Sequence, residues 1–219
     1  MCISKSNQRH MAEKGPPLGH VDNAQTSPER RQMIYLMRHG ADAPDRYGGW
    51  SHFGLTDVGR RQVCAARSRL LNKGITEIYS SDLARAKETA QLVAEYLCLP
   101  VIYLPKFRES NNGYLAGMLK EEAARKYPGK YWNSLAWTEP WPGGESPQEF
   151  YQRIKTAWYE FKDCVHGKTV LLVSHGGVMN VILCLENNVP YTNKETRYKI
   201  CDAEVIQTGG QMPVGTHFL

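Results

Sequence analysis

Two stretches of the chain share one plan: IYLMRHG at residues 34–40 and LLVSHG at residues 171–176. Each is a short apolar run, which predicts a buried β-strand, followed by a polar residue and then by His-Gly. In an open parallel sheet the carboxyl ends of the strands line the ligand crevice. If the two strands are neighbours, His39 and His175 meet at one pocket. The glycine after each histidine allows a tight turn or a close approach to a ligand, which makes Gly176 a candidate binding residue.

The rest of the chain alternates apolar strands with amphipathic helices. Strands are expected at residues 33–37, 75–81, 101–104 and 169–174, with a late one at 203–207. Helices are expected after a Thr56 N-cap, at residues 82–97 and 121–127, after a Ser146 capping box with Pro147 at the first helical position, and at 178–185. This alternation predicts an α/β fold with a mostly parallel central sheet and helices on both faces.

The pattern divides the chain into a tail and one domain. Residues 1–31 are polar and without periodicity, which predicts a flexible tail before a domain at residues 32–219. Within the domain, residues 118–145 are expected to form a small, irregular cap insertion. Its aromatic residues are either a lid over an apolar part of the substrate or a small core that holds the insertion together. They are Tyr131, Trp132, Trp137 and Trp141.

Composition excludes several classes of protein. With 219 residues, 42% hydrophobic and 22% charged, the chain is neither wholly disordered nor collagen-like nor a coiled coil. It has no apolar run long enough to span a membrane and no apolar segment typical of a secretory signal. The net charge of +5 comes without a long basic run, so nucleic-acid binding is not indicated. Six cysteines without a CxxC pair, most of them in apolar segments, predict reduced, buried thiols in a cytoplasmic protein with no zinc site.

The chemistry suggested by these residues concerns a phosphoryl group. A histidine is a nucleophile only when it is neutral, and neighbouring cations such as Arg38 disfavour the imidazolium form of His39. Arg85, at the start of a helix after a strand end, can aim a second guanidinium at the same point. Two arginines and two histidines suit the charge spread over three phosphoryl oxygens.

The leaving oxygen of a phosphate ester also needs a proton. Glu109, after the third strand, is the best candidate for that general acid. The alternative is that Glu109 is a surface ion-pair partner of Arg108.

Six motifs make the chain similar to a known family. They are MRHG (37–40), LTDVGRRQ (55–62), YSSDLARAKETA (79–90), RESNNGYLAG (108–117), GGES (143–146) and LLVSHGGV (171–178). In this order and spacing, they resemble branch 1 of the histidine phosphatase superfamily, also called the phosphoglycerate mutase-like family. The resemblance spans residues 33–207, nearly all of the predicted domain.

The resemblance implies a role for each matching residue. His39 aligns with the phosphorylated nucleophile and Glu109 with the proton donor, while Arg38, Arg85 and His175 align with the phosphate pocket. The implied reaction passes through a phosphohistidine that water attacks in a second step, without a metal or organic cofactor. The implied partner is a small phosphorylated molecule, and a homodimer stays an open possibility.

Two positions depart from the family pattern. Asp45 stands where the family often has an asparagine that touches phosphate, so either its loop points away or it meets another group of the substrate. Ala116 stands where the family often has an acidic residue. Neither change removes the central residues, but both leave the substrate open. We expect residues 44–54 and 111–145 to select it.

Three functions compete. The first is hydrolysis of a small-molecule phosphomonoester, which is favoured because the chain from Met33 has little room for the longer insertion and tail of the mutases. The second is phosphoglycerate mutase-type transfer in the same pocket. The third is a non-catalytic module that binds a phosphorylated ligand, which is disfavoured because such a module has no need of a neutral nucleophile.

Overall fold

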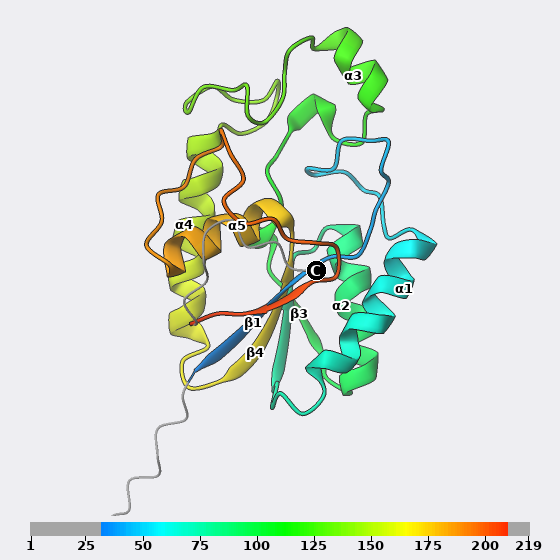
Figure 1. Cartoon of the computed structure of the whole chain (residues 1–219), viewed down its shortest axis with the longest axis vertical. Helices are drawn as coiled ribbons and strands as arrows, with labels where there is room; N and C mark the ends of the chain where they lie inside the picture. Colours follow the sequence, from blue (N-terminus) through cyan, green and yellow to red (C-terminus); the bar gives the residue numbers. More distant parts are fainter. Residues whose placement is uncertain (1–31, 210–219) are drawn as a thin grey trace, which may run out of the picture.

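A computed structural model describes residues 32–209 of the protein (Figure 1). The tail predicted at residues 1–31 and the last ten residues of the predicted domain, 210–219, lie outside the described residues. Within the described part of the chain, no helix is long and apolar enough to cross a membrane.

The centre of the fold is a five-stranded sheet with the strand order β3-β2-β4-β1-β5. Four strands run parallel, and β5 runs antiparallel to β1 at one edge. The predicted mostly parallel sheet is therefore confirmed. The strands are β1 (Met33–Arg38), β2 (Glu77–Ser80), β3 (Val101–Tyr103), β4 (Thr169–Ser174) and β5 (Val205–Gln207).

Helices cover both faces of the sheet, as predicted: α1 and α2 lie on one side and α4 and α5 on the other (Figure 1). The α-helices are α1 (Asp57–Ala66), α2 (Ala84–Leu97), α3 (Lys120–Lys126), α4 (Pro147–Cys164) and α5 (Gly176–Glu186). Three short 3₁₀ helices are η1 (Arg67–Leu70), η2 (Pro105–Phe107) and η3 (Gly113–Leu115).

Both predicted helix caps are present. The Thr56 hydroxyl accepts a hydrogen bond from the Gly59 amide at the start of α1. At the start of α4, the Ser146 side chain and the Glu149 side chain each bond the other residue's backbone, which completes a capping box.

Alternate residues of the central strands point to opposite faces and fill two cores. Leu36 and Leu172 pack with Trp158 and other residues of α4 and α5. Met37 and Val173 pack with the Val93 side of α2 and with α1. Because β1 and β4 are buried on both faces, their register is fixed from both sides of the sheet.

Three residues of the cap, Ala123, Leu135 and Trp141, form a third, smaller core with Leu115 of η3. Trp141 is 3% exposed, and Trp132 stacks on it with ring centroids 6.3 Å apart. The small-core interpretation of the aromatic residues therefore holds for Trp141.

The prediction of buried cysteines is wrong for most of the thiols that the structure describes. Cys184 in α5 is buried. Cys64 follows the buried Val63 by one position and so faces away from the apolar stripe of α1. Cys98 and Cys164 lie at the C-terminal ends of α2 and α4, where the helix leaves the core. The exposed cysteines are Cys64, Cys98, Cys164 and Cys201, and Cys2 lies outside the described residues.

The capping box gives a test of stability. We expect Ser146→Ala to lower the free energy of unfolding by about 1 kcal/mol, because the Glu149 amide at the start of α4 loses the Ser146 hydroxyl that accepts its hydrogen bond. Urea denaturation followed by circular dichroism measures this change. Ser68→Ala, at an exposed serine that bonds only the Ala65 carbonyl, is the matched control and should stay within about 0.5 kcal/mol of the parent. Equal stability of both variants would contradict the role of the cap.

Candidate active site

The parallel pairing of β1 with β4 brings the two predicted histidines together. Arg38 is registered opposite Ser174, and the His39 amide donates to the Ser174 carbonyl at 3.0 Å. The rings of His39 and His175 lie with centroids 5.1 Å apart. Arg85, at the start of α2, is 1% exposed and donates to His39. We call Arg38, His39, Arg85 and His175 the anion cup.

Hydrogen bonds fix the tautomer of His39. Its Nδ1 lies 2.7 Å from the Gly40 carbonyl oxygen, which can only accept, so Nδ1 carries the proton. Its Nε2 therefore holds a lone pair, and it accepts a hydrogen bond from Arg85 Nε at 3.2 Å. The unprotonated nitrogen of His39 therefore faces the Arg85 guanidinium.

Burial keeps both histidines neutral. It is the largest cause that lowers the pKa of His39 well below its usual value, and Arg85 and Arg38 lower it further. Burial also lowers the pKa of His175, again followed by Arg85. The arginines were expected to keep His39 neutral, but desolvation contributes more.

Arg38 is held at the rim of the cup. One Nη donates to the Ile200 carbonyl at 2.6 Å, and the other pairs with Asp202 at 3.0 Å. Its Nε is buried and finds no partner among residues 32–209. Gly176 begins α5 beside this guanidinium, and the amides at a helix N-terminus favour an anion. Gly176, which was predicted to be a binding residue, thus lies beside the cup.

Arg85 is fixed by the loop that follows His39. Its Nη atoms donate to the Ser51 hydroxyl at 3.4 Å and to the Gly49 carbonyl at 2.8 Å. Its Nε also lies 3.3 Å from Asp42, a carboxylate that the sequence analysis did not single out. Burial raises the pKa of Asp42, and Arg85 opposes that shift. By contrast, Asp45 is exposed and does not line the cavity beside the cup.

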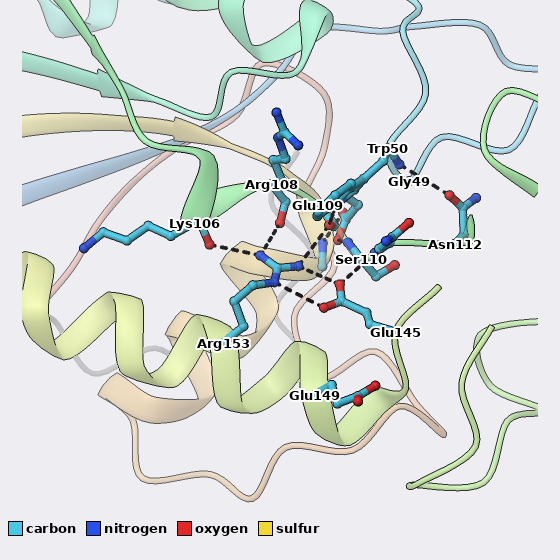
Figure 2. A network of polar contacts seen from close by, with 12 residues as sticks. Gly49, Trp50, Lys106, Arg108, Glu109, Ser110, Asn112, Glu145, Glu149 and Arg153 are labelled. Carbon is cyan, nitrogen blue, oxygen red and sulfur yellow. Dashed lines mark hydrogen bonds and ion pairs between the residues drawn. The ribbon is translucent and has the colours of Figure 1, made fainter. Parts of the chain in front are cut away.

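Glu109 lies in the loop after β3 (Figure 2) and lines the same cavity as Arg38 and His39. Its carboxylate accepts hydrogen bonds from the Ser110 amide at 2.9 Å and the Gly177 amide at 3.0 Å. The alternative of an ion pair with Arg108 is wrong, because Arg108 binds both carboxylate oxygens of Asp82, at 2.7 and 2.5 Å.

One contact of the cup went unpredicted although a signal for it exists. His175 Nε2 lies 2.8 Å from the Ser81 hydroxyl, and its Nδ1 is buried without a partner among the described residues. Ser81 follows the carboxyl end of β2, which pairs with β4. The carboxyl ends of neighbouring parallel strands meet at one edge of the sheet, so Ser81 could have been predicted at the cup if the strand order had been known.

A cavity of about 420 Å³ adjoins the cup. Its wall comes mainly from α5 and from residues 191–200, and not from the two segments expected to select the substrate, of which only Trp132 contributes. Asn193 joins the wall to the cap by donating to the Trp132 and Leu135 carbonyls at 2.8 and 2.9 Å. The lining residues are Arg38, His39, Glu109, Ser110, Trp132, Phe150, Gly176, Gly177, Asn180, Tyr191, Thr192, Asn193, Glu195, Thr196, Tyr198, Lys199 and Ile200.

Trp132 therefore belongs to both interpretations of the cap aromatics, since it packs on Trp141 and also lines the cavity. Trp50 lies in the segment 44–54 that was expected to select the substrate. It anchors the loop, because its indole N–H donates to the Glu109 carbonyl at 2.7 Å and its amide donates to Asn112 at 3.3 Å (Figure 2).

Known proteins are similar to this chain in sequence and fold. A probable phosphoglycerate mutase, GpmB, of Yersinia pestis is 33% identical over 181 residues, which cover 77% of this chain and 81% of that protein. A mycobacterial glucosyl-3-phosphoglycerate phosphatase is 27% identical, with a TM-score of 0.67 over 80% of this chain and 88% of that one. YhfR of Bacillus stearothermophilus is 26% identical, with a TM-score of 0.73 over 84% and 95%. The family model for the histidine phosphatase superfamily (branch 1) matches residues 34–211, and the chain belongs to this superfamily.

Proposed function

We propose that this protein hydrolyses a small-molecule phosphomonoester through a phosphohistidine on His39. The single observation that carries the proposal is the unprotonated Nε2 of a buried, neutral His39 that faces Arg85 in the cup. A site that only bound phosphate would gain from a protonated imidazole, whereas a nucleophile needs the lone pair.

In the first step, His39 Nε2 attacks phosphorus, and the bond from phosphorus to the ester oxygen breaks. The Glu109 carboxylic acid gives its proton to the leaving oxygen. Arg38, Arg85 and the α5 amide of Gly176 balance the charge on the three phosphoryl oxygens. The proton stays on Nδ1, which donates to the Gly40 carbonyl, so the imidazole ring carries one positive charge after phosphorylation.

In the second step, the Glu109 carboxylate takes a proton from a water molecule whose oxygen attacks phosphorus. The phosphorus–nitrogen bond breaks, inorganic phosphate leaves, and His39 recovers its neutral form. Glu109 thus returns to the acid form that the next turnover needs.

The cavity beside the cup suits the leaving alcohol. Trp132, Phe150 and Tyr191 offer an aromatic surface, and Asn180 and Thr192 offer polar groups. Asn180 Oδ1 is buried without a partner among residues 32–209, while Nδ2 bonds the Tyr198 carbonyl. A leaving group that combines a ring face with hydroxyl groups matches both kinds of wall.

A phosphoglycerate mutase activity is the second candidate, because the 33% identical relatives bear that name. It would use the same first step, after which a second substrate oxygen, not water, attacks phosphorus. Phosphate release from a panel of phosphomonoesters, compared with exchange between 2- and 3-phosphoglycerate, decides between them.

The nucleophile gives a prediction on labelling and turnover. His39→Ala should abolish acid-labile ³²P labelling of the protein and lower phosphate release by about 10³-fold or more, because the substitution removes the nitrogen that attacks phosphorus in the proposed first step. Rapid acid-free gel analysis after mixing with labelled ester measures the label. His166→Ala, at an exposed histidine remote from the cup, is the matched control and should label normally. Full turnover by His39→Ala would refute the assignment, and binding of phosphate without labelling of the parent protein would favour the binding module.

The neutral histidines give a prediction on pH. A histidine whose folded pKa is lowered stabilises the fold above its unfolded pKa, and this stability is lost as the pH falls below about 6.5. Each buried histidine should add about 1.4 kcal/mol per pH unit to the slope of the unfolding free energy between about pH 6 and pH 5. His39→Asn should lower that slope by about this amount, whereas His166→Asn should not. Urea titrations at a series of pH values measure the slope, and an unchanged slope in His39→Asn would mean that the folded protein protonates this ring.

A further inference from the structure

Arg153, on α4, forms an ion pair with Glu145, which lies just before the Ser146 N-cap (Figure 2). Arg153 Nε and Nη2 donate to the two carboxylate oxygens at 3.2 and 2.6 Å. The side chains are 23% and 14% exposed, so solvent screens this pair less than the pairs on the surface. We call these two residues the clamp.

The clamp holds the loop that carries Glu109. Arg153 donates to the Lys106, Arg108 and Glu109 carbonyls at 2.9, 3.0 and 3.1 Å. Glu145 accepts from the Asn111 amide at 2.7 Å, and its own amide donates to the Asn111 carbonyl at 2.9 Å. The hydrogen bonds of the clamp therefore lie on both sides of Glu109 in the sequence and on Glu109 itself.

This loop has little other regular structure. It runs from η2 to η3, two 3₁₀ helices of three residues each, and it lies beyond the end of β3. The Glu109 carbonyl is bonded by Arg153 and by the Trp50 indole. Neighbouring residues are also held by the Arg108–Asp82 ion pair and by the Ser174 hydroxyl, which donates to the Phe107 carbonyl at 2.9 Å. Among these anchors, the clamp bonds Glu109 together with residues on both sides of it. The Glu109 carboxylate then reaches the Gly177 amide across the cup.

We propose that Arg153 and Glu145 are positioning residues that hold Glu109 where it can protonate the leaving oxygen. The proposal rests on the proposed function, in which Glu109 is the acid. A planar guanidinium with five donors serves a carboxylate and three carbonyls at once, which an ammonium cannot do. Displacing a catalytic group by about 1 Å can lower a rate by about 10²-fold.

The leaving group separates this role from a structural one. An alkoxide needs a proton as it leaves, whereas 4-nitrophenolate leaves readily without one. We expect Arg153→Gln to lower kcat/KM by about 10²-fold on an alkyl phosphate such as glycerol phosphate, and by no more than about threefold on 4-nitrophenyl phosphate. Glu145→Gln, which keeps the size and one acceptor of the side chain, should give a smaller loss with the same selectivity. Arg153→Lys should not restore the alkyl ester activity.

A control variant shares the helix and the kind of interaction. Lys162 on α4 pairs with Glu186 at 2.9 Å, with exposed fractions of 31% and 19%, and neither residue lines the cavity. Lys162→Gln should therefore leave the ratio of the two ester activities unchanged. An equal loss on both esters in Arg153→Gln, or no loss on either, would overturn the proposal.

The Gly177 amide gives a readout that needs no turnover. It lies in the first turn of α5, where amides have no partner within the helix, and its partner is the Glu109 carboxylate. In Arg153→Gln, its hydrogen exchange should become faster and its ¹⁵N resonance should shift, although Arg153 does not contact it. Unchanged exchange would show that Glu109 keeps its place without the clamp.

Gly177→Ala separates failure of the clamp from failure of the proposed function. A Cβ at position 177 would lie 2.4 Å from Glu109 Oε1, so the carboxylate must move. If this variant loses alkyl ester activity selectively and Arg153→Gln does not, Glu109 is the acid and the clamp proposal is wrong. If the parent protein hydrolyses neither ester, the proposed function is wrong, and the Gly177 amide alone decides whether the clamp positions Glu109.

Discussion

The site depends on the parallel pairing of β1 with β4. Because Arg38 is opposite Ser174 in the ladder, the residues that follow each strand, His39 and His175, emerge side by side. A shift of one residue would move every core side chain of β1 to the wrong face, so the packing of both cores protects the geometry of the cup. The hydrophobic pattern that folds the sheet is therefore the same pattern that assembles the site.

A second constraint is the close approach of α1 to the loop after β1. A Cβ on Gly40 would lie 2.5 Å from the Gly59 carbonyl oxygen, and a Cβ on Gly59 would lie 2.2 Å from the Ala41 carbonyl oxygen. Gly40 thus allows a close approach of the backbone to α1. This contact holds the Gly40 carbonyl against His39 Nδ1 and so maintains the tautomer that leaves Nε2 free.

Features that depend on residues close together in the sequence could be predicted. Features that depend on contacts between distant residues could not. Strands, helix caps and the meeting of His39 with His175 follow from periodicity and from the rule for strand ends. Ser81 and Asp42 were not predicted as site residues. The place of Ser81 depends on the strand order, and the place of Asp42 depends on the path of a loop. The part of the cavity wall formed by residues 191–200 was not predicted for the same reason, because Asn193 is fixed by carbonyls about sixty residues earlier in the chain. The prediction that the cysteines are buried was wrong because one helical step, as from Val63 to Cys64, turns a side chain from the core to solvent.

The start of α4 connects the stability of the fold with the placement of Glu109. Ser146 and Glu149 begin the helix, Glu145 immediately before them binds the loop, and Arg153 further along the helix binds both. Fraying of the first turns of α4 would separate the two clamp residues before the sheet lost any contact. The cup itself, built on β1, β4 and α2, would keep its two arginines and two histidines. In the proposed mechanism, phosphate binding and proton donation are thus supported by different parts of the fold, so either can change while the other is kept.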